Sequence, residues 1–420
     1  MKKRVAVYLG SIYRGDAKYG RFLLTMLLSG IAYGLYRGVQ DNYLAEIVHI
    51  SKFERGIVEF FRELPGLLVV LTLAAMYRLT ESKILKIGMA VMLAGVAGLM
   101  LFGSGKFIVV VFMVVFSFGE HIIMPVKSTI AMDLAKPEQG GMALGVSGSL
   151  NQIGHIAGFV VVTGLFVAFS RFGLGQGSIV PFKAVFAISV ALMVGAVLVS
   201  LTLQESKIKP ERKRFYFAKK FSKFYMLEIF YGSRKQVFMT FAPYVLILQY
   251  GADTSTISIL LAICADCGAV ASPMIGRLID KLGYKTVMVS DTLILVVVCF
   301  FYGFSHRIFS TDVAFVIVCV NYVMDSIISL ASMASNVYVR DISDSAEELT
   351  ATLSTGVSVN HLISIFIALV GGWIWEHVGM ELLFSLSAFL GILNSIYAAT
   401  IKTNKNDSGP GETRQNFDQI

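Results

Sequence analysis

Charged residues are scarce in this chain. Of its 420 residues, 15% are Asp, Glu, Lys or Arg, whereas 55% are hydrophobic. Soluble domains carry about 25% charged residues, so this composition excludes an ordinary soluble protein. It predicts an integral membrane protein whose chain crosses the bilayer several times.

Cysteine is equally scarce. The four cysteines, Cys264, Cys267, Cys299 and Cys319, all fall in apolar stretches, where disulfides are not expected. Cys264 and Cys267 form a CADC sequence, but no second pair of ligands accompanies them. A metal site is therefore not predicted, because buried cysteine commonly packs as a small hydrophobic residue.

Sequences typical of enzymes are missing as well. The chain has no G-x-x-x-x-G-K-[ST] sequence, which would hold the phosphates of ATP. It also lacks a polar stretch long enough to form a soluble cofactor domain and a cluster of His, Cys and acids at ligand spacing. We therefore expect no catalysis, no cofactor and no metal.

Long apolar stretches dominate what is present. A helix needs about 20 residues to cross about 30 Å of hydrocarbon, and only helices satisfy their own backbone there. We therefore predict an all-α polytopic fold with twelve spans. They are 22–48, 56–77, 84–104, 107–131, 142–168, 180–203, 224–249, 255–276, 285–305, 312–338, 350–375 and 379–401.

The basic residues report topology. Most of the 36 Lys and Arg fall in the N-terminus, the even-numbered loops and the C-terminus. By the positive-inside rule, both termini are cytoplasmic. The net charge of +8 therefore gives no reason to expect nucleic-acid binding, although the basic cluster at 205–224 also suits a phospholipid surface.

A weak internal repeat divides the chain. Residues 34–37 match 232–235 at an offset of 198, 78–81 match 277–280 at 199, and 149–153 match 358–362 at 209. Three matches in order predict duplicated halves of six helices. The predicted parts are an N-terminus with a short interfacial helix (1–21), a first bundle (22–204), a basic linker (205–223), a second bundle (224–401) and a disordered tail (402–420).

One loop carries a family resemblance. GRLIDKLGYK, from Gly276 to Lys285, resembles the cytoplasmic signature of the major facilitator superfamily, G-x-x-x-D-R-x-G-R-R, whereas the first-half counterpart, AMYRLTESK, has lost the glycines. The resemblance implies two six-helix bundles, a solute site between them and transport by alternating access. It also implies a cytoplasmic latch, in which glycine lets helix ends approach closely. The candidate latch residues are Arg78, Glu81, Gly276, Arg277, Asp280 and Gly283.

Glycines of the fifth span allow two interpretations. Gly145, Gly154 and Gly158 have a spacing similar to the antiporter motif of the same family, but Phe159 stands where that motif has proline. Close helix packing is the favoured explanation, and export is the alternative.

Several charged and polar residues lie at membrane depth, where an unpartnered charge is costly. In the family, the first, fourth, seventh and tenth helices line the cavity. Arg37 and Lys235 match in the repeat and are hypothesised to hold an anionic group between them. The substrate-binding candidates are Tyr36, Arg37, Gln40, Asp41, Glu120, His121, Asn151, Arg234, Lys235, Gln236, Asn336 and Asn360.

Glu59, Arg62 and Glu63 form the predicted proton-coupling group, because Arg62 can exchange partners between the two acids. The alternative is structural: Arg37 with Asp41, and Glu59 with Arg62, have the spacing of ion pairs that lock helices together. Asp291 and Glu228 are expected close to the cytoplasmic ends of their spans, in contact with water.

The sequence thus predicts a monomeric secondary transporter of a bacterial inner membrane. An organic anion is the predicted solute, with a proton gradient or a counter-solute as the driving force. Two alternatives remain open: an exporter of drugs, lipids or other amphiphiles, and a receptor or partner subunit that does not transport.

Overall fold

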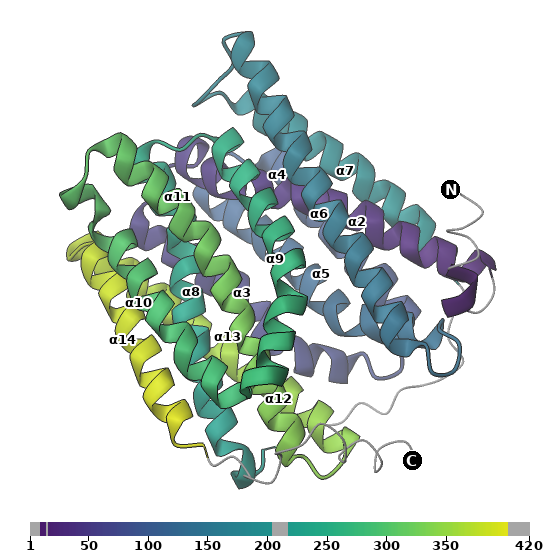
Figure 1. Ribbon diagram of the computed structural model, residues 1–420. Helices are drawn as coiled ribbons and strands as arrows, with labels where there is room; N and C mark the ends of the chain where they lie inside the picture. The colour runs from purple at the N-terminus through teal and green to yellow at the C-terminus, as the bar shows by residue number, and fades with distance from the viewer. Residues whose placement is uncertain (1–8, 14–15, 204–216, 402–420) are drawn as a thin grey trace.

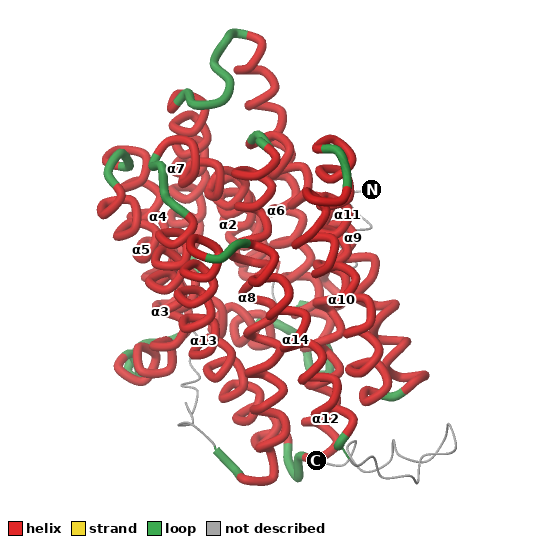
Figure 2. Tube along the Cα trace, turned by 90° about the vertical axis from the view of Figure 1, so that its left-hand side faces the viewer, coloured by secondary structure: helices red, strands yellow, loops and turns green. Residues whose placement is uncertain are grey.

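The computed structural model describes residues 9–13, 16–203 and 217–401. Helices account for nearly all of this part (Figures 1 and 2). Residues 9–12 are helical. Most of the basic linker and the polar tail from 402 lie outside the described residues.

The described residues of the first half form six long helices and one π-helical turn. They are α2 (Asp16–Asn42), η1 (Tyr43–Ile47), α3 (Lys52–Ala75), α4 (Glu81–Phe102), α5 (Lys106–Asp133), α6 (Gly140–Arg171) and α7 (Ile179–Leu201). Ser51 starts α3 with a capping box, in which Ser51 and Glu54 bond each other's backbone N–H groups.

In the second half, up to residue 401, six long helical segments follow in the same order, together with two short 3-10 turns. This half contains η2 (Lys219–Phe221), α8 (Ser222–Tyr250), α9 (Thr254–Leu282), α10 (Tyr284–Ile308), α11 (Thr311–Ile328), η3 (Ser329–Ser332), α12 (Met333–Ile342), α13 (Ala346–His377) and α14 (Met380–Ala399).

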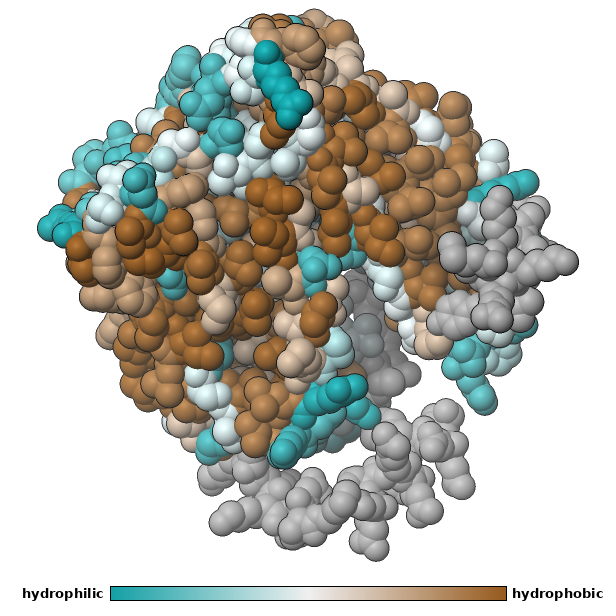
Figure 3. All heavy atoms as spheres, turned by 45° about the horizontal axis from the view of Figure 1, so that its top comes forward, coloured by the Kyte–Doolittle hydropathy of each residue, from teal (hydrophilic) through white to brown (hydrophobic). Residues whose placement is uncertain are grey.

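In the part of the chain that the structure describes, ten helical segments are long and apolar enough to cross a membrane; one combines α11, η3 and α12. Neither α3, with 24 residues, nor α8, with 29, is among them. Charged and polar side chains interrupt the apolar sequence of both helices. Apolar atoms cover most of the face in Figure 3, as expected for a surface in contact with lipid.

Glycines allow close packing within the first half. A Cβ at Gly154 would lie 2.8 Å from Leu27 O, and one at Gly158 would lie 2.5 Å from Ile31 O. Both positions therefore need glycine for α6 to lie against α2, which favours the packing interpretation. A Cβ at Gly145 would meet no atom within 4 Å, so Gly145 takes no part in this contact.

The packing corrects the register of the repeat. Asn151 packs on Gly30 in the first half, and Asn360 packs on Gly232 in the second. Gly232 therefore corresponds to Gly30 and not to Gly34, which shifts the match by one helical turn. At this offset of 202, the counterpart of Lys235 is Tyr33 and not Arg37.

Among the described residues, the two halves meet mainly along two helix pairs, α3 with α13 and α6 with α9. A Cβ at Gly56 would lie 2.2 Å from Ala368 O, so α3 and α13 are nearly in backbone contact there. Near this contact, Tyr244 Oη donates to Ile50 O at 2.8 Å and Asn42 Nδ2 to Ala252 O at 3.0 Å. These interactions close one end of the molecule, which we call the sealed end.

Candidate solute site

Six charged residues on α2 and α3 form a continuous chain. Arg37 bonds Asp41 at 2.8 Å, and Asp41 bonds Arg55 at 3.0 Å. Arg55 continues to Glu59 at 2.9 Å. Arg62 then bonds Glu59 at 2.6 Å and also bonds Glu63. Three cations and three carboxylates alternate, so the chain is neutral as a whole.

Arg55 is the member that the sequence analysis missed. Its side chain is 1% exposed and lies over the ring of Tyr244, 5.8 Å from the centroid. It joins α3 to α2 through Asp41. The π-helical turn η1 lies between these helices, and sequence spacing does not predict where that turn places the two side chains.

A cavity of about 400 Å³ lies where the two halves meet beside this chain. Three helices of each half line it: α2, α3 and α5, and α8, α12 and α13. Eight of the lining residues are among the site candidates predicted from sequence: Arg62, Glu63, Glu120, His121, Lys235, Gln236, Asn336 and Asn360. Tyr33, Glu228 and His361 also line it, although they were not among the site candidates.

The cavity opens away from the sealed end. Four lining residues are exposed; Met124, Asn336 and Val357 lie away from the sealed end, and Met239 alone lies nearer to it along α8. Along α13, Val357 comes before His361, whereas the sealed end lies beyond it, at Ala368. A solute can therefore enter from the end opposite the seal.

Several predicted binding residues do not line this cavity. Arg37 and Asp41 satisfy each other, as the structural alternative supposed. Tyr36 is buried with its ring 4.1 Å from that of Phe116, and Gln40 is also buried. Arg234 bonds Asp291 at 3.2 Å within the second half, so Asp291 is not the solvated residue that we expected.

Asn151 faces a neighbouring pocket of about 380 Å³ that shares Tyr33, Glu120 and Met124 with the cavity. Its amide also donates to Met26 O at 3.1 Å. Four methionines line this side pocket: Met26, Met89, Met92 and Met124.

Polar partners bind Glu63 of α3 and Glu228 of α8, the acids of these two helices that line the cavity. Glu63 Oε2 is 2.8 Å from His361 Nδ1. Glu228 accepts hydrogen bonds from Ser335 at 3.1 Å and from Asn360 at 3.3 Å. Glu59 lies deeper and accepts from Gln236 at 3.2 Å. Lys235 has no ion-pair partner among the described residues.

The predicted latch is not closed in this structure. A close approach of helix ends was expected at Gly276. A Cβ at this position would meet no atom within 4 Å, so the helix ends do not approach closely there. Arg277 and Asp280 are exposed and form no ion pair among the described residues. Gly283 has a φ of 79° and ends α9, where its freedom is needed. Arg78 is exposed and Glu81 is buried.

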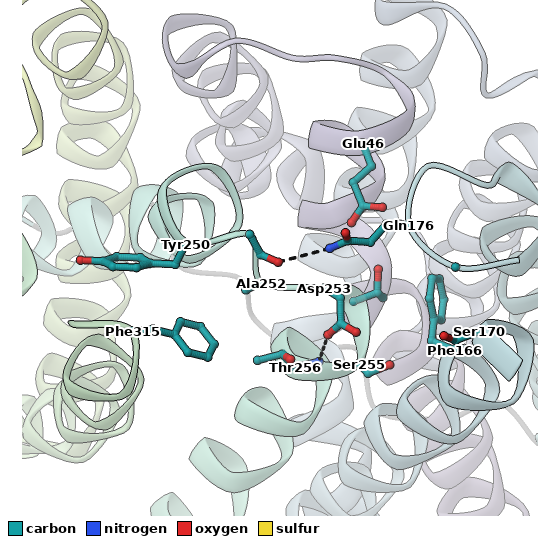
Figure 4. Close-up of a pocket in the computed structure, with 13 residues that line it drawn as sticks. Glu46, Phe166, Ser170, Gln176, Tyr250, Ala252, Asp253, Ser255, Thr256 and Phe315 are labelled. Atoms are coloured by element: carbon teal, nitrogen blue, oxygen red, sulfur yellow. Dashed lines mark hydrogen bonds between the residues drawn. The ribbon is translucent and has the colours of Figure 1, made fainter. Parts of the chain in front are cut away.

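A further pocket of about 440 Å³ lies at the sealed end (Figure 4). Gln176, from the first half, donates to Gly251 O of the second at 3.2 Å. Asp253 caps α9 through the Thr256 N–H at 2.8 Å. Glu46 also lines this pocket. This pocket shares no lining residue with the central cavity.

Solved transporter structures are similar in fold. The nucleoside transporter NupG matches at a TM-score of 0.69 and 14% identity, over 91% of this chain and 99% of its own. A D-xylose–proton symporter matches at 0.70 and 16%, over 92% and 98%. A bacterial homologue of the iron transporter ferroportin in its inward-facing state matches at 0.69 and 13%, over 90% and 97%.

Sequence comparison gives the family. No curated protein sequence matches the chain. The model of the Major Facilitator Superfamily matches it twice, over residues 22–234 and 224–417. The two matches confirm the duplication and together cover most of the sequence, so the chain belongs to the major facilitator superfamily.

Proposed function

We propose that this protein is a secondary active transporter that moves a small polar solute by alternating access. All twelve helical segments span the membrane in this proposal, with both termini in the cytoplasm of a bacterial cell. The observation that carries it is the cavity of about 400 Å³, which draws its lining from both halves and opens at one end. Rocking of the halves about such a site exposes it to each side in turn.

The charges of the cavity favour a solute with a cationic or strongly polar centre. Glu63, Glu120 and Glu228 face Arg62 and Lys235 there, so acids outnumber bases. Arg62 is already held by Glu59 and Glu63. The organic-anion hypothesis therefore depends on Lys235, because Arg37 and Arg234 do not line the cavity.

Glu63 is the better of the two proposed coupling acids. It lines the cavity and bonds His361 on the opposite half, whereas Glu59 is enclosed by two arginines and Gln236. Protonation of Glu63 changes a bond between the halves. Protonation of Glu59 changes its bonds to Arg55 and Arg62 within α3 and its bond to Gln236 of the second half, but Glu59 does not line the cavity.

Export of an amphiphile is the second candidate function. The four methionines of the side pocket support it, because methionine adapts to varied apolar shapes. A thermal-shift screen of the purified protein against anions, amines, sugars and amphiphiles discriminates these classes. Lys235→Gln removes the response to anions if the anion hypothesis is correct.

Spin-label distances test the alternation itself. Ser170→Cys with Ser255→Cys places labels on both halves at the sealed end, and Met142→Cys with Leu278→Cys places them toward the opposite end; the four native cysteines are replaced first. In proteoliposomes, we expect two populations of label-to-label distances for each pair. The long-distance population should grow as the short-distance population falls. A single distance for both pairs, under every solute and pH, would indicate a receptor that does not transport.

A further inference from the structure

Two histidines and one glutamate converge at the centre of the cavity. Glu63 lies on α3, His121 on α5 and His361 on α13. One ligand atom from each lies within 4.8 Å of the others. The imidazole rings of His121 and His361 have centroids 5.1 Å apart. We call these three residues the cavity triad.

The hydrogen bonds leave a nitrogen of His121 available. Its Nδ1 is 2.8 Å from Ser117 O, which can only accept, and 3.1 Å from Ser117 Oγ, which donates its proton to Arg62 O at 2.6 Å. Nδ1 therefore carries the proton, and Nε2 presents a lone pair. A metal-binding histidine is typically oriented by this kind of bond from its other nitrogen to a carbonyl.

Gly66 leaves space between the two imidazoles. A Cβ at this position would lie 2.7 Å from His121 Nε2 and 2.7 Å from His361 Nδ1. Both nitrogens, and His361 Cε1 at the same distance, therefore lie around one point beside α3. Any side chain at residue 66 would fill it.

The distances suit a metal ion after small side-chain rotations. Ligands around tetrahedral zinc lie about 3.4 Å apart, given bonds of about 2.0 to 2.1 Å. His361 Nδ1 and Glu63 Oε2 are already 2.8 Å apart through a hydrogen bond. An ion would replace the proton between them and draw His121 inward.

The surrounding charges support a cation at this point. Arg62 holds Glu59 through two bonds, from Nε at 3.0 Å and from Nη2 at 2.6 Å. It contacts only Oε1 of Glu63, so Oε2 remains directed at the histidine. Glu120 and Glu228 line the same cavity and add two negative charges, against one positive charge from Lys235.

We propose that the cavity triad binds a divalent transition-metal ion, of the class of Zn²⁺, Co²⁺ or Fe²⁺, as a solute that the protein transports. Two imidazoles with one carboxylate suit these ions better than Mg²⁺ or Ca²⁺, which prefer oxygen ligands. Three protein ligands leave a coordination position for water from the cavity. Such an open site allows an ion to leave when the cavity changes sides. This inference rests on the proposed function.

Cobalt is the probe for the test. The purified full-length protein is titrated with Co²⁺, and binding is followed by calorimetry and by the visible absorption of tetrahedral Co²⁺. We expect one ion per chain, displaced by Zn²⁺ and not by Mg²⁺. His121→Gln and His361→Gln each weaken binding at least tenfold, whereas His377→Gln, on an exposed histidine of the same helix α13, leaves it unchanged.

Gly66→Ala keeps all three ligands and fills the space between them, so it serves as a second variant if a histidine variant fails to fold. It is expected to weaken Co²⁺ binding by a similar factor. No Co²⁺ binding by the wild-type protein, or equal binding by wild type, Gly66→Ala and the double variant of both histidines, overturns the proposal.

Transport separates this inference from the proposed function. Proteoliposomes that contain a metal-sensitive dye should accumulate Zn²⁺, and His361→Gln should not. If Zn²⁺ fails while the Ser170 and Ser255 labels still alternate, the triad proposal is wrong and the transporter proposal stands. If the labels do not alternate, the transporter proposal fails, whatever binds at the triad.

Discussion

His361 reaches across the cavity to Glu63, with 2.8 Å between its Nδ1 and the carboxylate Oε2. The two residues are 298 positions apart in sequence and belong to different halves. Glu63 is also the last member of the chain of charges that begins at Arg37. This contact therefore connects the buried charges of the first half to the position of α13. Any movement of the halves must either carry this bond along or break it.

Glu63 is expected to make the conformational equilibrium depend on pH. In the wild-type protein, the distances between labels at Ser170 and Ser255 should differ between mildly acidic and mildly alkaline proteoliposomes. Glu63→Gln should remove this difference, because the amide does not titrate. Glu120→Gln is the control: it also removes a cavity carboxylate, but not one that bonds α13. Equal pH dependence in wild type and Glu63→Gln would contradict the coupling role.

Arg55 is expected to stabilise the folded state far more than an exposed arginine does. Arg55→Gln leaves Asp41 and Glu59 buried with fewer partners, and breaking a buried ion pair costs about 3 to 5 kcal/mol. Arg78→Gln is the matched control, since Arg78 is exposed and bonds only Tyr77 Oη among the described residues. Its loss should cost less than about 1 kcal/mol. Reversible unfolding in mixed detergent micelles measures both values, and similar losses would contradict the prediction.

Much of the fold was predictable because it depends on local composition. The span expected at 56–77 corresponds to α3, which begins earlier, at Lys52, because the Ser51 capping box extends it. The duplication was visible in short matches, but its register was wrong in the first helix. Arg37 and Lys235 share a charge, and charge similarity misled the alignment. The contacts of Gly30 and Gly232 depend on tertiary packing and correct it.

The contacts within the site were predictable only where the two residues are neighbours in sequence. Arg37 with Asp41, and Arg62 with Glu59, have helical spacing, and both pairs form. The cavity triad has no such spacing, because His121 and His361 reach Glu63 from other helices. The bond from Arg55 to Asp41 likewise depends on the geometry of the α2 to α3 connection. Long-range contacts of this kind leave no periodic signal in one sequence.

The sealed end should open when α3 and α13 are pushed apart. Gly56→Ala places a methyl group where Ala368 O lies 2.2 Å away, and a backbone atom cannot rotate aside. We therefore expect a larger share of long distances between the Ser170 and Ser255 labels. Gly145→Ala is the control, since its Cβ would meet nothing within 4 Å. An unchanged distribution for Gly56→Ala would show that the α3 and α13 contact does not hold this end closed.

Lys220 provides a test of structure outside the membrane. Its amine donates to Asp344 and to Glu348, each at 2.6 Å, and these bonds raise the pKa of Lys220. A raised pKa leaves less neutral amine at a given pH, so acylation of Lys220 should be slow. The stabilisation from this contact is fully present below the ordinary lysine pKa of about 10.4, and it is lost as the pH rises through the raised pKa.

Mass spectrometry measures the acylated fraction of Lys220 at each pH. The curve of this fraction against pH should move to lower pH in the double variant Asp344→Asn with Glu348→Gln. Lys223, which bonds Thr400 O, serves as the internal control and should keep its curve in that variant. If the Lys220 curves of the wild type and the double variant coincide, the two carboxylates do not bind the Lys220 amine under the conditions of the measurement.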